Sequence, residues 1–457
     1  MADTIAAIAT SLSDSGIGII RISGKDAVSI SHSLYITKSG RRILDRFESH
    51  TIHYGFIEDP KTGEVIDEVM VSVMKAPRSY TGEDTVEINC HGGVLVCKKI
   101  LEAVIESGAR LALPGEFSKR AFLNGKMDLC KAEAVMDLIH SRNENALCAS
   151  VRQLKGSVSK EIRQMRAQIL HEIAFIESAL DDPEHISLDG YDEELAQKIE
   201  ELIARISKLL LTADKGRMIK EGIHTVIVGK PNAGKSSFLN LLLGEERAIV
   251  TSVAGTTRDI LEESVSLGGI HLNLIDTAGI RQTEDVVEKI GVEKARSYAK
   301  DADLIIYVVD SSVPLDENDK EIRELIKDKK TIILLNKSDL DTVVTRKDFE
   351  ENSIVIATSA KENVGMEEFE EAISKLFLGG EIKANDEVMI TNLRHKNALS
   401  DSLESLKLVR ISIENGMPED FYSIDLMSAY ASLGSIIGEE VGEDLVNEIF
   451  SKFCLGK

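Results

Sequence analysis

Apolar residues recur at intervals of three and four positions through a long segment that begins near residue 154. This stripe comprises Leu154, Val158, Ile162, Met165, Ile169, Ile173, Ile176 and Leu180. The spacing predicts one long α-helix with an apolar face, which we expect to pack in a core; an intermolecular coiled coil is the alternative. Asp181-Asp-Pro183 ends that helix, a second helix runs from about Glu193 to Leu211, and residues 386–453 are again helical in pattern.

Residues 1–118 follow a different pattern, in which short apolar runs alternate with polar turns. The runs Gly18–Ile22, Thr51–Tyr54, Val69–Met74 and Thr85–Ile88 have the composition of strands. The segment Val94–Glu106 has the pattern of a helix. Several short strands with a helix among them indicate an α+β domain.

A strand, a glycine-rich turn and a helix follow one another in the middle of the chain. His224–Gly229 is β-branched and apolar, and a helical segment ends at Gly244. The pattern predicts a doubly wound α/β domain over residues 220–378, inserted into one helical domain made of residues 119–219 and 379–457. Two unrelated helical pieces are the alternative.

Length and charge narrow the class of protein. The chain has 457 residues, room for about three domains, and a formal net charge of −23, which argues against broad electrostatic binding to nucleic acid. Its five cysteines form no C-x-x-C pair, and an odd count fits a reducing cytoplasm. No apolar run is long enough to span a bilayer, so we expect a cytoplasmic protein without a membrane partner.

The most informative motif is the run from Gly229 to Ser236, Gly-Lys-Pro-Asn-Ala-Gly-Lys-Ser, a complete G-x-x-x-x-G-K-[ST] phosphate loop. Successive N–H groups of such a loop, at the start of a helix, surround the phosphates of a nucleotide. Lys235 would reach the β- and γ-phosphates, and the Ser236 hydroxyl would bind Mg²⁺.

Four further segments follow in the order of a Ras-like GTPase: Gly255–Asp259, Asp276–Gly279, Asn336–Asp339 and Ser359–Lys361. Thr257 would be the second hydroxyl on Mg²⁺. The carboxylate of Asp339 can accept two hydrogen bonds from the guanine edge, and adenine lacks those donors. The motifs together predict GTP as the ligand.

The position after Gly279 departs from the Ras pattern, because Ile280 stands where a glutamine orients water. Gln282 lies two positions further on and would point elsewhere. The nearby run Glu284–Glu288 supplies carboxylates, but its spacing alone favours a solvated helix start. Another group must therefore position the water, or hydrolysis is slow.

Several short segments at both ends of the chain form a recognisable set: Asp3–Thr10, Gly16–Gly24, Ser79–Asp84, His91–Gly93, Pro114–Ser118, Arg120–Asn124, Asn392–His395 and Phe453–Lys457. Through them and the central GTPase motifs, the chain resembles over its whole length the MnmE (TrmE) family of tRNA-modification GTPases. The resemblance implies a potassium-stimulated GTPase that, with the FAD-carrying flavoprotein MnmG (GidA), adds an aminomethyl or carboxymethylaminomethyl group to carbon 5 of the wobble uridine, position 34, of certain tRNAs. It also implies that the N-terminal domain binds 5-formyltetrahydrofolate or a related folate and forms the homodimer. With MnmG the chain would form a heterotetramer or a larger complex.

The resemblance assigns site residues by position. The folate contacts would be Arg21, Glu87, Lys126 and Lys457, although each alone is more typical of an ordinary strand, loop or terminal charge. Potassium, in the place of an arginine finger, would take Asn232, Thr251, Val253 and Thr256. The catalytic residues would be Lys235, Thr257, Cys454 and Glu288, the last now as the acid that orients water. The GTP site would comprise Asn232, Ala233, Gly234, Lys235, Ser236, Ser237, Thr251, Ser252, Val253, Ala254, Gly255, Thr256, Thr257, Asp276, Thr277, Ala278, Gly279, Asn336, Lys337, Ser338, Asp339, Ser359, Ala360 and Lys361.

Several alternatives stay open at this point. Cys454 is either a nucleophile or a buried helical cysteine. Ser11–Ser15 replaces a Pro-Pro and Gly-Arg-Gly stretch usual in the family, so the loop's conformation is undetermined. Basic residues crowd one predicted helix and would form either a tRNA surface or a solvated face: Arg152, Lys155, Lys160, Arg163 and Arg166. The alternative functions are a ribosome-assembly GTPase switch and a stand-alone folate enzyme with a regulatory GTPase domain.

Overall fold

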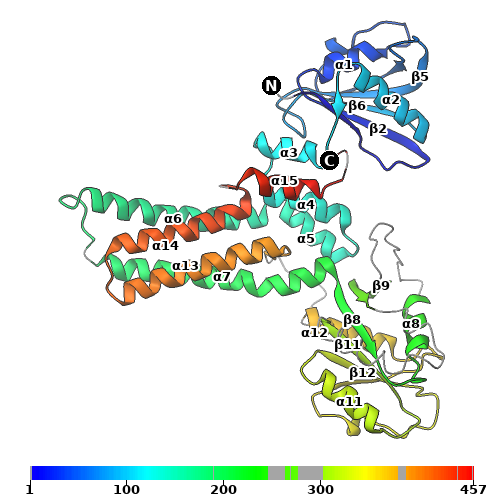
Figure 1. Cartoon of the computed structure of the whole chain (residues 1–457), viewed down its shortest axis with the longest axis vertical. Helices are drawn as coiled ribbons and strands as arrows, with labels where there is room; N and C mark the ends of the chain where they lie inside the picture. Colours follow the sequence, from blue (N-terminus) through cyan, green and yellow to red (C-terminus); the bar gives the residue numbers. More distant parts are fainter. Residues whose placement is uncertain are drawn as a thin grey trace. The chain divides into compact units, whose positions relative to one another are not determined.

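The computed structural model of the chain describes residues 3–188, 190–244, 263–267, 269–275, 302–378, 388–439, 441–454 and 456. These residues form two compact units (Figure 1): Met1–Met136 with Leu433–Lys457, and Asp137–Ser432. The first unit therefore contains both ends of the chain, and the second contains the middle. None of the described helices combines the length and the apolar content that a membrane span requires.

The first unit contains a seven-stranded sheet of order β3-β4-β5-β6-β2-β1-β7. Its strands are β1 (Ile5–Ile8), β2 (Ser15–Ser23), β3 (Tyr35–Ile36), β4 (Thr51–Glu58), β5 (Val65–Met74), β6 (Thr85–Gly92) and β7 (Arg110–Leu111). Only the β1–β7 pair is parallel within this sheet. Helices α1 (Ala27–Leu34) and α2 (Val94–Glu106) pack on the sheet through a common apolar core, as expected of an α+β domain.

The C-terminal segment of the chain packs within this same unit. Leu129 and Ala132 of α4 (Leu129–His140) share an apolar core with Val446 and Phe450 of α15 (Glu443–Ser451). Beside them lies α3 (Glu116–Leu123), and a short 3₁₀ helix spans Leu44–Arg46. This packing brings the last residues of the chain to the N-terminal sheet.

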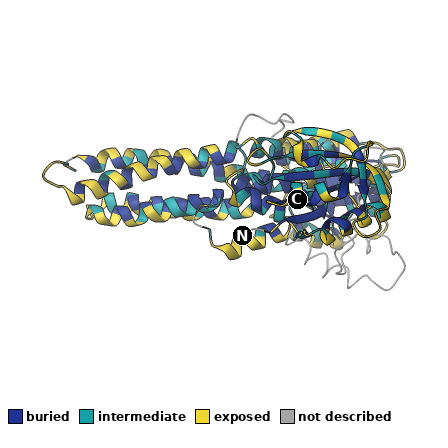
Figure 2. Ribbon diagram, turned by 90° about the horizontal axis from the view of Figure 1, so that it is seen from above, coloured by how far each residue is buried: buried dark blue, intermediate teal, exposed yellow. Residues whose placement is uncertain are grey.

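The helices of the second unit include α5 (Glu144–Leu154), α6 (Ser157–Asp181), α7 (Tyr191–Glu221) and α13 (Leu393–Glu414). α14 (Glu419–Ile437) belongs to this unit as far as Ser432. The stripe predicted for α6 is buried from Val158 to Ile176, so it faces a core, whereas Leu180 is exposed. Buried and exposed residues alternate along the long helices (Figure 2). The prediction of one helix from Leu154 was wrong, because Gly156 takes a left-handed conformation, φ 92°, that ends α5 and begins α6. The second helix was predicted to end at Leu211 but continues ten residues further.

A six-stranded sheet of order β13-β12-β11-β8-β10-β9 lies in the chain between α7 and α13. Its strands are β8 (Ile223–Val228), β9 (Glu263–Leu267), β10 (Ile270–Leu274), β11 (Leu304–Asp310), β12 (Thr331–Asn336) and β13 (Ile354–Ala357), and only β9 pairs antiparallel. α8 (Lys235–Gly244) and α12 (Met366–Leu378) contribute to one apolar core, and α11 (Glu317–Ile326) to another. Helices on both faces make this the predicted doubly wound domain, inserted in the helical one; a 3₁₀ helix spans Arg346–Asp348.

Candidate functional site

The phosphate loop joins the end of β8 to the start of α8, and its shape depends on residues with positive φ. Asn232 has φ 60° and Gly234 has φ 96°. A Cβ atom on Gly234 would lie only 2.0 Å from Nδ2 of Asn336, so no larger residue fits without a shift. Ser236 and Ser237 lie in the first turn of α8, where the partial positive charge of a helix N-terminus suits phosphate.

Asn336 connects three of the predicted motifs. Its side chain is buried at the end of β12, and its Nδ2 donates to the carbonyl of Ala233 at 2.9 Å. Its Oδ1 accepts from the backbone N–H of Ala360 at 3.2 Å. The loop, the Asn336–Asp339 segment and the Ser359–Lys361 segment are thus held together at the carboxyl ends of parallel strands, where doubly wound domains bind ligands.

Lys235 lies across the loop that precedes it. Its ammonium donates to the carbonyl oxygens of Gly229 at 2.8 Å and Lys230 at 2.7 Å. Burial lowers the pKa of Lys235 from its ordinary value. Lys230 is the other cation of the loop, and it pairs instead with Asp319 at 2.6 Å and with Asp316.

The segment predicted to bind the base is ordered by its own polar contacts. Ser359 Oγ donates to Asp339 Oδ1 at 2.7 Å, and this hydrogen bond is the main reason that the pKa of Asp339 is lowered. Lys361 lowers it further through its charge. Lys337 has φ 64° and its ammonium contacts Asp310 Oδ2 at 2.6 Å, while the N–H of Ser338 donates to Thr358 at 3.0 Å. Asp339 is therefore held as a carboxylate beside the loop.

Part of the predicted nucleotide site lies outside the described residues. This part comprises Thr251, Ser252, Val253, Ala254, Gly255, Thr256, Thr257, Asp276, Thr277, Ala278, Gly279 and Glu288. Of the predicted metal ligands, only Ser236 for Mg²⁺ and Asn232 for K⁺ are described. Within the ranges that the structure covers, no group of three or more His, Cys, Asp or Glu side chains is placed to hold a metal ion.

A second site candidate lies in the first unit, around Arg21 on β2. Its Nε donates to Glu87 Oε1 on β6 at 2.8 Å, and its Nη1 donates to the carbonyl of Gly456 at 2.9 Å. The guanidinium lies 5.8 Å from the ring centroid of Tyr80 and 5.7 Å from that of Phe117. We call Arg21, Tyr80, Glu87, Phe117 and Gly456 the N-terminal cluster.

The other residues assigned to the folate site are less closely grouped. Lys126 donates to the carbonyl of Pro77 at 2.9 Å, and Lys457 lies outside the described residues. Cys454 is exposed, so the hypothesis of a buried helical cysteine is wrong. Its carbonyl oxygen accepts a hydrogen bond from the Gly115 N–H at 3.4 Å. The segment Ser11–Ser15 is an exposed turn that leads into β2. A carboxylate, two cations and an aromatic ring fit a flat ligand that carries acidic groups.

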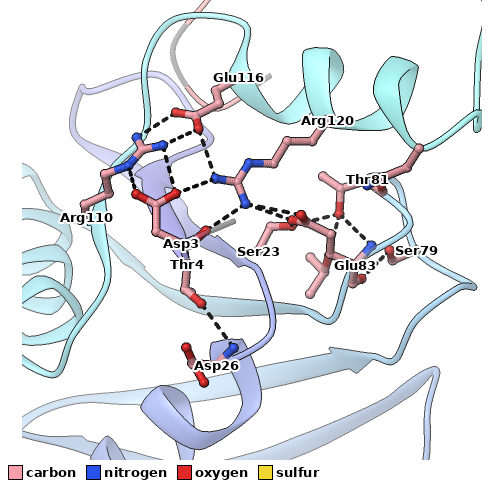
Figure 3. A network of polar contacts seen from close by, with 12 residues as sticks. Asp3, Thr4, Ser23, Asp26, Ser79, Thr81, Glu83, Arg110, Glu116 and Arg120 are labelled. Atoms are coloured by element: carbon pink, nitrogen blue, oxygen red, sulfur yellow. Dashed lines mark hydrogen bonds and ion pairs between the residues drawn. The ribbon is translucent and has the colours of Figure 1, made fainter. Parts of the chain in front are cut away.

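A network of ion pairs that no sequence motif indicated lies beside this cluster (Figure 3). Arg120 of α3 is buried and contacts Asp3 at 3.2 Å, Glu83 at 3.0 Å and Glu116 at 3.0 Å. Arg110 also pairs with Asp3 and Glu116. We call these five residues the Arg120 network. The segments Ser79–Asp84 and Arg120–Asn124 both carry the family resemblance. Their contact joins Glu83 and Arg120, which are 37 positions apart in the chain, so no local pattern reveals it.

The basic residues predicted to crowd one helix lie on two helices and the turn between them. Arg152 lies on α5, Lys155 in the turn after it, and Lys160, Arg163 and Arg166 on α6. Arg166 is buried; it donates to the carbonyl of Tyr430 at 3.2 Å and lies 3.9 Å over that ring. Arg166 is thus a packing residue of the helical core and not part of an RNA surface.

Two family models match the chain: one described as the MnmE helical domain at residues 129–454, the other as the GTP-binding protein TrmE N-terminus at residues 4–126. The chain is 58% identical over 457 residues to a tRNA modification GTPase MnmE of Lachnoclostridium phytofermentans, covering 100% of this chain and 99% of the relative. Another relative of that name, from Alkaliphilus oremlandii, is 47% identical over 462 residues, with 100% and 99% covered.

Solved structures resemble parts of the chain. The G domain of the T. maritima FeoB iron transporter is 29% identical, with 34% of this chain and 97% of that chain covered and a TM-score of 0.26. A variant of Aquifex aeolicus Era bound to GDP·AlF4⁻ is 28% identical, with 41% and 67% covered and a TM-score of 0.27.

Proposed function

The chain belongs to the MnmE family of tRNA modification GTPases, and from that premise we propose which reaction it takes part in and which residues serve it. It is a GTP hydrolase of tRNA modification. We propose that, with the flavoprotein MnmG, it adds an aminomethyl or carboxymethylaminomethyl group to carbon 5 of the wobble uridine. The observation that carries the proposal is identity of 58% across the full chain with a tRNA modification GTPase.

The nucleotide would lie on the phosphate loop, with its base at Asp339. Lys235 would turn from the carbonyls of the loop to the phosphates, and Ser236 with Thr257 would hold Mg²⁺, which neutralises charge between the β- and γ-phosphates. The clamp by Asn336 supports this role, since it fixes the loop and the base segment in one geometry. A site held rigidly in this way loses little entropy when it binds.

Hydrolysis would depend on a potassium ion in place of an arginine finger. Asn232, Thr251, Val253 and Thr256 would hold it; the described member, Asn232, carries an amide oxygen in the loop itself, a ligand type that suits a hard cation. A cation there adds positive charge where negative charge develops. We expect GTP turnover in potassium to exceed that in sodium by at least roughly tenfold, and equal rates would remove potassium from the mechanism.

The N-terminal unit would bind a tetrahydrofolate that supplies one carbon. Arg21, Lys126 and Lys457 would meet its acidic tail, and Glu87 would accept hydrogen bonds from its ring. Folate binding and homodimer formation would belong to residues 1–118, the helical parts would be residues 119–219 and 379–457, and the nucleotide domain residues 220–378. The FAD would lie on MnmG; a cytoplasmic location stays a prediction.

The test is an assay of wobble uridine modification with the purified chain, GTP, folate and tRNA, with and without MnmG. We expect the modified base only when both proteins are present. Modified tRNA formed without the flavoprotein would show a stand-alone folate enzyme, and absence of product with both proteins would favour the alternative of a ribosome-assembly switch.

A further inference from the structure

We propose that Arg120 is a positioning residue for folate. It fixes the segment Ser79–Asp84, which lies next to the predicted folate residues Arg21 and Lys126. The inference rests on the proposed folate-binding function. Arg120 itself forms no hydrogen bond with either cation among the described residues; it lies on α3, and its guanidinium reaches Glu83 of the segment on one side and Asp3 and Glu116 on the other (Figure 3).

The Arg120 guanidinium joins α3 to Glu83 of this segment. Its Nη1 donates to Glu83 Oε2 at 3.0 Å, to Glu83 Oε1 at 3.3 Å and to the carbonyl of Asp3 at 2.8 Å. Its Nη2 donates to Glu116 Oε1 at 3.0 Å and Asp3 Oδ1 at 3.2 Å. Because the guanidinium is buried, these charge-assisted bonds are stronger than bonds at the surface.

The segment is fixed from its other side as well. Ser23 Oγ on β2 donates to Glu83 Oε2 at 2.9 Å and lies 2.7 Å from Thr81 Oγ1. Asn124, which follows α3, donates to the carbonyl of Thr81 at 2.8 Å. Glu83 is therefore the point at which β2, the segment and α3 meet (Figure 3), and Arg120 supplies the charge at that point.

Two other residues of the segment, Tyr80 and Gly82, lie next to predicted folate residues. The Tyr80 ring lies beside Arg21, and its hydroxyl is 2.8 Å from Ser118 Oγ of α3. Gly82 lies against Lys126, since a Cβ atom there would come within 3.3 Å of Lys126 Cγ. A displacement of this one segment would therefore disturb the surroundings of both cations together.

The structure provides a matched control in Arg110. This arginine pairs with the same Asp3 and Glu116 as Arg120 does, but among the described residues it forms no hydrogen bond or ion pair with Glu83. Replacing either arginine removes one positive charge from the network. Only replacement of Arg120 also removes the ion pair to Glu83 of the segment.

The experiment is calorimetric titration of the full-length chain with 5-formyltetrahydrofolate. Arg120→Met should raise the dissociation constant at least tenfold, Arg120→Lys should recover part of the affinity, and Arg110→Met should change it by less than about threefold. Thermal unfolding of each variant shows whether it is folded. If Arg120→Met does not fold, Glu83→Gln removes the same ion pair while keeping the shape, and it should weaken folate by a similar factor.

The outcomes separate the inference from the function on which it rests. Equal losses in the Arg120→Met and Arg110→Met variants would overturn the inference, because the network would then act only through general stability or charge. Unchanged affinity in both Arg120→Met and Glu83→Gln would also overturn it. A wild-type chain that does not bind the folate would overturn the proposed folate function and, with it, the inference.

Discussion

The nucleotide site takes its parts from runs of neighbouring residues, whereas the N-terminal cluster and its supporting network take theirs from residues as far apart as Arg21 and Gly456, 435 positions in the chain. The first depends on backbone shape, through the positive φ of Asn232 and Gly234. The second depends on ion pairs between side chains, among which the Arg120 side chain is buried. Backbone shape at strand ends leaves a contiguous motif in the sequence, and ion pairs across a sheet do not.

The two regions should also respond differently to the loss of one cation. Lys235→Ala removes the ammonium that would meet the β- and γ-phosphates, so we expect GTP turnover to fall by about 10³-fold. Lys230→Ala is the matched control, because Lys230 lies in the same loop but pairs with Asp316 and Asp319. Steady-state phosphate release measures the turnover of both variants. Equal losses of turnover would mean that the total positive charge of the loop matters more than the position of the lysine.

Glu288→Ala tests the residue that would orient water in place of the missing glutamine. We expect turnover to fall by about 10²-fold while the dissociation constant for GTP stays nearly unchanged, since water orientation acts on the reaction and not on binding. Titration with a slowly hydrolysed GTP analogue gives the affinity. A parallel loss of binding would show that Glu288 is structural.

Asn336→Ala tests whether one side chain holds the nucleotide site together. Asn336 is in this respect the counterpart of Arg120, which we propose holds the segment Ser79–Asp84. The buried Ala233 carbonyl and Ala360 N–H would lose their partner, so we expect the nucleotide domain to be destabilised by about 2 kcal/mol. Urea unfolding followed by hydrogen exchange in β12 measures the change. Asn318 is exposed, so Asn318→Ala serves as the control. An equal loss of stability in that variant would contradict the role of Asn336 in joining the loop to the base segment.

The smallest predicted effect concerns pH and His271 on β10, which is buried and has no hydrogen-bond partner for either ring nitrogen among the described residues. Burial, and secondly the charge of Arg142, lower the pKa of His271 to about 4. Between pH 6.5 and 4 the unfolded chain binds a proton here that the folded chain does not, so stability falls as pH falls. From pH 7 to 5 we expect a loss of about 1–2 kcal/mol that His271→Leu abolishes; an unchanged pH dependence in that variant would assign the loss to other groups.

The sequence alone predicted the fold class and the described parts of the nucleotide motifs because each depends on local rules. The period of three and four in α6 and the glycines of the loop are such rules. It missed the break at Gly156, because a glycine within a continuing apolar stripe is compatible with a helix. It also misjudged Arg166, since a cation on a polar-looking face can still pack over Tyr430, and that partner lies in another helix.

The Arg120 network could not have been predicted in the same way. Its acids and arginines look like surface charges in a chain that has many, and only the sheet order brings β7, α3 and the Ser79–Asp84 segment together. Whether the residues assigned by resemblance bind folate, potassium and magnesium stays a prediction.

We propose that the two regions serve one reaction. GTP would be hydrolysed at the phosphate loop while a carbon held at the N-terminal cluster is transferred. The direct measurement follows a ¹³C-labelled one-carbon unit from tetrahydrofolate into tRNA, in the presence of MnmG, for the wild-type chain and for Lys235→Ala. We predict labelled wobble uridine with the wild type and GTP, and none with Lys235→Ala although it still binds folate. Label incorporated equally by the variant, or without GTP, would contradict the claim.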